Sequence, residues 1–160
     1  MGIILASQSP RRKELLELAG IEHRVIVSQV DEILDEDLDV AGQVQDLAIQ
    51  KACPVAELFP QETIIGADTI VVFGGKILGK PKNEEDAFNM LKSLSGRKHQ
   101  VMTGVSIINK DKELLTSFVN ITEVEFYNVT DEWILNYIQS GEPMDTAGSY
   151  GIQGKGFDLV

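Results

Sequence analysis

The stretch that decides the fold is "GIILASQSPRRKELLELAG", residues 2–20, at the start of the chain. Residues 2–6 form a short apolar run, which is typical of a buried strand. Ser9 is a suitable N-cap, and Pro10 then fits the first position of a helix. Apolar residues recur with helical spacing as far as Gly20, which is a natural stop. The stretch therefore predicts a strand, a tight turn and a helix.

Two arginines, Arg11 and Arg12, fall in the first turn of this expected helix. A helix start carries partial positive charge, so each arginine costs about 0.3–1 kcal/mol there unless an anion is bound. A phosphate held by free N–H groups, the hydroxyls of Ser7 and Ser9 and the two guanidinium groups would reverse that cost. In the alternative interpretation both arginines point away and solvate a surface turn.

Composition sets limits on the function. The 160 residues include 43% apolar and 24% charged residues, a balance typical of a folded domain with its own core. The only cysteine is Cys53, so no intrachain disulfide can form. The net charge of -11 opposes binding to nucleic acid, and neither a basic leader nor a long apolar segment indicates secretion or a membrane partner. We therefore expect a cytoplasmic protein without nucleic-acid or membrane partners.

The rest of the chain is read from apolar spacing and turn residues. We expect strands at residues 23–28, 63–73, 76–78, 99–109 and 114–128, and helices at 43–59, 82–96 and 131–141. Gly74 and Gly75 form the predicted turn of one hairpin. Pro54 lacks an N–H group and is expected to interrupt the middle helix.

Asp68 follows the apolar run "TIIGA" and precedes the apolar run "TIVV". A lone carboxylate between such runs needs a cation, hydrogen bonds or solvent, since burying it bare costs several kcal/mol. A metal site or a proton-transfer role explains its position. A turn aspartate that caps a bend at Gly66 is the alternative.

Three further polar residues are candidates. Lys80 comes just before Pro81, where the backbone is extended and an ammonium could reach a phosphate, and Lys51 has the same chemistry on the middle helix. Each is otherwise an ordinary surface lysine. Gln153 lies in "GSYGIQGKG", a glycine-rich loop, and its amide can donate and accept hydrogen bonds at a base edge.

Six motifs occur in order between residues 3 and 156: "ILASQSPRRKELL", "VDE", "IGADTIVV", "GKPKNEEDA", "LSGRKHQVMTGVSI" and "GEPMDTAGSYGIQGKG". Together they resemble the Maf family, the septum-formation-associated nucleoside triphosphate pyrophosphatases. The resemblance implies one Maf-like domain over residues 1–160. It also implies an α/β fold similar to that of inosine triphosphate pyrophosphatases, with a long mixed sheet, helices, and two lobes around a central cleft.

The resemblance further implies hydrolysis of a nucleoside triphosphate between the α and β phosphates, with Mg²⁺ or Mn²⁺ as cofactor and a homodimer as the common assembly. Asp68 matches the proton acceptor or a metal-linked acid, and Glu32 matches a second acidic position and candidate metal ligand. Phosphate contacts are implied for Ser7, Ser9, Arg11, Lys51 and Lys80.

Three positions select a branch of the family. Arg12, Thr69 and Gln153 resemble the branch that acts on dTTP and UTP, whereas the 7-methyl-GTP branch carries Trp, Gln and Glu there. Family members generally continue through another strand and a final helix, of which residues 157–160 resemble only the beginning. The alternatives are a 7-methyl-GTP pyrophosphatase and a nucleotide-binding regulator of cell division that does not catalyse. A house-cleaning role for the enzyme is equally open.

Overall fold

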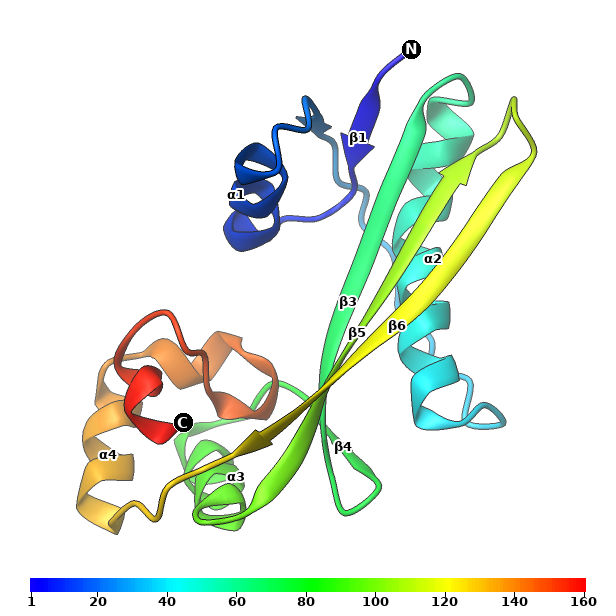
Figure 1. Cartoon of the computed structure of the whole chain (residues 1–160). Helices are drawn as coiled ribbons and strands as arrows, with labels where there is room; N and C mark the ends of the chain where they lie inside the picture. Colours follow the sequence, from blue (N-terminus) through cyan, green and yellow to red (C-terminus); the bar gives the residue numbers. More distant parts are fainter. The chain divides into compact units, whose positions relative to one another are not determined.

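The computed structural model describes all of residues 1–160 and contains a six-stranded sheet. The strand order is β2-β1-β3-β5-β6, and β4 pairs with β3 (Figure 1). The strands are β1 (Ile3–Leu5), β2 (Arg24–Val25), β3 (Thr63–Phe73), β4 (Lys76–Leu78), β5 (Lys98–Asn109) and β6 (Leu114–Glu125). The helices are α1 (Pro10–Leu18), α2 (Val40–Leu58), α3 (Glu84–Leu94) and α4 (Asp131–Gln139), followed by the 3₁₀ helices η1 (Glu142–Asp145), η2 (Ala147–Ser149) and η3 (Lys155–Leu159).

The sheet is mixed. Strand β1 runs parallel to β2 and to β3, with Ile4 opposite Arg24 on one side and Ile64 on the other. Strands β3 and β4 are antiparallel, and Gly74 and Gly75 between them have φ values of 59° and 76°. Positive φ at both central residues is what a tight hairpin requires, so the predicted turn is confirmed.

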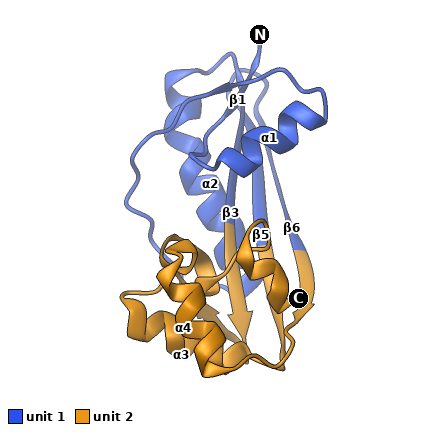
Figure 2. Ribbon diagram, turned by 90° about the vertical axis from the view of Figure 1, so that its left-hand side faces the viewer, with its two compact units in different colours: residues 1–68, 103–120 blue, residues 69–102, 121–160 orange.

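The chain divides into two compact units (Figure 2). The first comprises residues 1–68 and 103–120, and the second comprises residues 69–102 and 121–160. In the first unit, apolar side chains of α2 pack against β1, β3 and β5; the buried members are Ile4, Ala6, Ala52, Val55, Ala56, Ile64 and Ile108.

Helix α2 corrects the expected break at Pro54. It runs unbroken from Val40 to Leu58 with Pro54 inside it. The proline removes the N–H that would bond the carbonyl of Gln50. Two residues near the proline, Ala52 and Val55, are fully buried against the sheet. Packing of this face therefore outweighs the loss of one helical hydrogen bond.

The strand expected at residues 23–28 is shorter than predicted. Only Arg24 and Val25 pair with β1, and both Val25 and Val27 are 41% exposed. This strand lies at the edge of the sheet, so its apolar residues have a neighbour on one side only.

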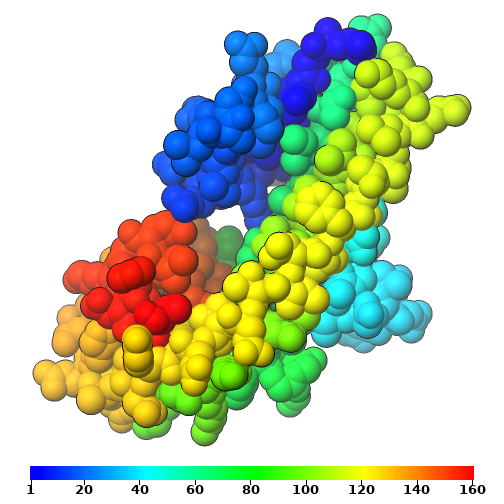
Figure 3. Space-filling view, viewed as in Figure 1, coloured from blue at the N-terminus to red at the C-terminus, as the bar shows by residue number.

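The second unit has its own core between α3, α4 and the end of β6. Its buried members include Leu91, Ile134, Phe126, Tyr150 and Leu159. The last residues of the chain, red in Figure 3, lie at the surface beside α4, and Tyr127 N–H donates to the Leu159 carbonyl at 2.8 Å. Every helix in the chain is too short or too polar to cross a membrane.

Candidate functional site

The start of α1 has the predicted cap. The Ser9 hydroxyl accepts a hydrogen bond from Arg12 N–H at 3.3 Å, and Ser7 Oγ accepts one from Ser9 N–H at 3.3 Å. Pro10 occupies the first helical position, and no acidic residue lies in the first turn. The positive end of this helix therefore lacks the carboxylate that usually accompanies it.

The two arginines of this turn point in different directions. Arg12 Nη1 donates to Ser7 Oγ at 3.0 Å and to the Ala67 carbonyl at 3.1 Å. Burial lowers the pKa of the Arg12 guanidinium, and the charge of Asp68 acts in the opposite direction. Arg11 is 54% exposed and lies 3.7 Å from Glu14. The expectation of two inward arginines thus holds for Arg12, and the solvated alternative describes Arg11.

Asp68 lies inside the uninterrupted strand β3, so the interpretation as a turn residue at a Gly66 bend is wrong. Its Oδ1 atom is 2.6 Å from Lys51 Nζ, and the same ammonium is 3.2 Å from Glu32 Oε1. The Asp68 side chain is only 13% exposed, against 45% for Glu32. A single lysine therefore balances one nearly buried carboxylate and one half-exposed carboxylate.

Two glycines bring Lys51 to this position. A Cβ on Gly66 would lie 2.5 Å from the Ala48 carbonyl oxygen, and one on Gly104 would lie 2.4 Å from that of Val44. Any side chain at these places would push α2 away from β3 and β5. This contact was not predicted from the sequence, although glycine inside a β-branched strand is a recognised signal of close backbone approach.

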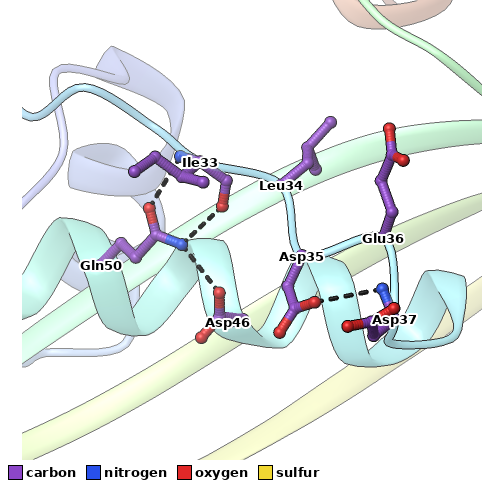
Figure 4. A pocket seen from close by; sticks show the side chains of 7 residues that line it. All are labelled: Ile33, Leu34, Asp35, Glu36, Asp37, Asp46 and Gln50. Carbon is purple, nitrogen blue, oxygen red and sulfur yellow. Dashed lines mark hydrogen bonds between the residues drawn. The ribbon is translucent and has the colours of Figure 1, made fainter.

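An open pocket of the first unit is not suited to phosphate. It measures about 500 Å³ and lies between α2 and the acidic loop before it (Figure 4). Its lining residues are Ile33, Leu34, Asp35, Glu36, Asp37, Asp46 and Gln50. The charged members are all carboxylates, so this cavity repels a polyanion.

Lys80, Thr69 and Gln153 belong to the second unit. Lys80 Nζ lies 2.9 Å from Asp145 Oδ1, and the two side chains are 65% and 91% exposed. Thr69 directly follows Asp68 in β3, and Gln153 is an exposed residue between η2 and η3.

The segment that carries Gln153 is held by buried partners at the two residues that begin it. Tyr150 Oη lies 2.6 Å from His99 Nε2, and Gly151 N–H donates to Tyr137 Oη at 3.2 Å. Burial lowers the pKa of His99, which is 3% exposed and packs edge-on against Phe126. His99 therefore has a structural role, and no local pattern in the sequence indicates its tie to the glycine-rich loop.

A family model described as Maf-like protein matches residues 2–160, and the chain belongs to this family.

Two similar proteins have names that describe an activity. A dTTP/UTP pyrophosphatase of Bacillus cereus (strain AH820) is 54% identical over 158 residues, which cover 99% of this chain and 82% of the relative. A dTTP/UTP pyrophosphatase of Bacillus mycoides (strain KBAB4) is 52% identical with the same coverage.

Two solved structures share the fold. The Ham1 protein of Staphylococcus aureus has a TM-score of 0.52 at 20% identity, covering 78% of this chain and 71% of that chain. A nucleoside-triphosphatase, also described as a dITP/XTP pyrophosphatase, of Mycobacterium abscessus has a TM-score of 0.51 at 11% identity, covering 81% and 76%. These neighbours confirm the predicted α/β fold with a mixed sheet.

Proposed function

We propose that this chain is a nucleoside triphosphate pyrophosphatase that hydrolyses dTTP and UTP to the monophosphate and pyrophosphate. The observation that carries the proposal is the cluster in which Lys51 lies between Asp68 and Glu32, with Arg12 beside Asp68. Membership of the Maf-like family, and relatives at 52% and 54% identity named dTTP/UTP pyrophosphatases, support it.

Phosphate binding is assigned to Ser7, Ser9 and Arg11 at the start of α1, and to Lys51. Free N–H groups at a helix start attract anions, and the first turn of α1 holds no acidic residue to oppose one. The contact between Arg11 and Glu14 is exposed, and such pairs contribute only about 0–1 kcal/mol. A phosphate can therefore replace Glu14 as the partner of Arg11 at little cost.

Asp68 is the proposed proton acceptor. It takes a proton from the attacking water while the bond between the bridging oxygen and phosphorus breaks and pyrophosphate leaves. Lys51 is a fixed cation beside it, and it stabilises the negative charge that grows on the phosphate oxygens.

Glu32 and Asp68 are the proposed ligands of a Mg²⁺ or Mn²⁺ ion. Their oxygens fit such an ion, since Mg²⁺ is usually held by one or two carboxylates together with substrate phosphates. The two carboxylates already share one cation, the Lys51 ammonium. No three His, Cys, Asp or Glu side chains of the chain are grouped so that they could hold a metal ion together, so phosphate oxygens are the expected remaining ligands. When bound, the ion neutralises substrate charge and acidifies water.

Four residues receive roles from the family resemblance. Lys80 is assigned to the phosphates, and Arg12, Thr69 and Gln153 to selection of the pyrimidine base. An amide and a hydroxyl match the alternating carbonyl and imide groups of thymine and uracil. A substrate that leaves one buried partner unpaired loses about 1–3 kcal/mol of binding free energy.

We also propose that the protein is a cytoplasmic homodimer.

The test is pyrophosphate release from dTTP, UTP and 7-methyl-GTP with Mg²⁺ or Mn²⁺. We expect turnover of the first two and little of the third. A preference for 7-methyl-GTP would move the chain to the other branch of the family. Saturable binding of nucleotides without any pyrophosphate would instead identify a non-catalytic regulator.

A further inference from the structure

Gln50 lies next to Lys51 in α2. Its side chain hydrogen-bonds to the backbone of Ile33, which follows Glu32 in the acidic loop before α2. We propose that Gln50 is a positioning residue of the proposed site: it fixes the backbone of Ile33 and so keeps the Glu32 carboxylate against the Lys51 ammonium. The inference rests on the proposed function, in which Glu32 takes part in binding the metal ion.

Two hydrogen bonds join the side chain of Gln50 to the backbone of Ile33 (Figure 4). Ile33 N–H donates to Gln50 Oε1 at 3.0 Å, and Gln50 Nε2 donates to the Ile33 carbonyl at 2.7 Å. Gln50 Nε2 also donates to Asp46 Oδ2 at 2.7 Å. Because a carboxylate only accepts hydrogen bonds, Asp46 sets which end of the Gln50 amide is the donor.

The pairing places two consecutive residues of the loop against two consecutive residues of the helix. Ile33 meets Gln50, and Glu32 meets Lys51 at 3.2 Å. Helix α2 is held close to the sheet at Gly66 and Gly104, so the helix side of this pairing is rigid. The position of Glu32 therefore depends on how firmly the loop is held.

Little else holds that part of the loop. Residues 26–34 contain no helix or strand, and the side chains of Ile33 and Leu34 are 70% and 48% exposed. The acidic residues of the loop and Asp46 on the helix repel one another across the cavity. Apolar burial thus contributes little here, and apart from the Glu32–Lys51 ion pair the charges oppose the contact, so it depends strongly on the Gln50 hydrogen bonds.

The experiment compares Gln50→Ala and Gln50→Glu with the control Gln43→Ala. Gln50→Glu keeps the size of the side chain and one acceptor but removes both Nε2 donations and adds charge beside Asp46. Gln43 is a fair control, because its Nε2 also donates to this loop from α2, at 2.9 Å to the carbonyl of Leu38.

Two readouts are measured. The first is pyrophosphate release from dTTP as a function of Mg²⁺ concentration, in the wild-type and in the Glu32→Gln backgrounds. We expect both Gln50 variants to raise the Mg²⁺ concentration for half-maximal activity or lower turnover by about 10- to 100-fold. In the Glu32→Gln background the same changes should have no further effect, and Gln43→Ala should leave both backgrounds unaltered.

The second readout is hydrogen exchange at the Ile33 amide, which needs neither metal nor activity. Both Gln50 variants should speed this exchange while residues in the buried core of α2 remain protected. Unchanged exchange at Ile33, or an equal loss of activity in both backgrounds, overturns the inference. If the wild-type chain released no pyrophosphate, the proposed function would fail. Hydrogen exchange at Ile33 would still decide whether Gln50 holds the loop.

Discussion

Each unit contains a lysine paired with an aspartate, and the pairs Lys51–Asp68 and Lys80–Asp145 differ chiefly in how far they are buried. In the first unit, Lys51 and Asp68 are 2.6 Å apart with side chains 25% and 13% exposed. In the second unit, Lys80 and Asp145 are 2.9 Å apart but 65% and 91% exposed. Water screens the second pair almost completely, whereas the first depends on its protein surroundings. Distance alone therefore does not tell which pair matters.

The largest difference between the two pairs is expected when each aspartate is neutralised. Asp68→Asn should lower turnover of dTTP by about 10²-fold or more, because the proposed proton acceptor is lost. The folded state should persist, since an amide still fits beside Lys51. Asp145→Asn is the control, and steady-state kinetics with circular dichroism measures both. Retained activity in Asp68→Asn would remove this residue from the mechanism.

A second prediction concerns the packing that supports the inner pair. Gly66→Ala should destabilise the protein by about 3 kcal/mol, at the upper end of the range for overpacking. The new methyl group would meet the Ala48 carbonyl oxygen at 2.5 Å and Ala52 Cβ at 2.8 Å. The matched control is Gly79→Ala, where nothing lies within 4 Å of the added carbon. Urea unfolding should separate the two, and equal stabilities would show that α2 can move away freely.

The second unit contains a buried ionisable group, His99, which should make the stability of the protein depend on pH. Burial lowers the pKa of folded His99, so below about pH 6.5 the unfolded chain binds the proton that the folded chain resists. Stability from this residue is complete above that pH and is lost as the pH falls toward the folded pKa. The loss is at most about 1.4 kcal/mol for each pH unit of the shift.

Urea unfolding between about pH 8 and pH 5 measures this effect. His99→Gln keeps a hydrogen-bonding side chain near Tyr150 but cannot titrate. Its stability should therefore fall less with acid than that of the wild type. His23→Gln is the control, and identical pH dependence in His99→Gln and the wild type would contradict the prediction.

The smallest effect is expected at the outer pair. Asp145→Asn should change the free energy of unfolding by no more than about 1 kcal/mol, as is usual for exposed ion pairs. It should also lower the KM for the triphosphate slightly, because Lys80 loses a competitor for phosphate. Lys80→Gln should raise the same KM. A stability loss in Asp145→Asn as large as that in Gly66→Ala would remove the distinction between the two pairs.

Sequence patterns predicted the elements well where one local rule dominates. Ser9 and Pro10 correctly indicate the start of α1, and Gly74 with Gly75 correctly indicates a hairpin turn. The break at Pro54 was wrong, because local propensity says nothing about the buried face that keeps α2 continuous.

The residues of the candidate site were proposed from the sequence, but the way in which they pair could not be predicted from it. The position of Asp68 between apolar runs predicted a cation, hydrogen bonds or solvent beside it, yet nothing local named Lys51 as its partner. Helical spacing also could not separate Arg11 from Arg12, which differ only in which side of the first turn they occupy. The hydrogen bonds between Gln50 and Ile33 join residues 17 positions apart, so no local pattern in the sequence indicates them.

The contact at Gly66 and Gly104 has a consequence for how this protein can change over time. The height and rotation of α2 over the sheet are set by main-chain atoms of Val44 and Ala48 resting on two bare backbone positions. Inserting a single residue between Ala48 and Lys51 would turn the ammonium about 100° around the helix axis. Lineages that keep the chemistry should therefore vary in length ahead of α2 and never within this stretch.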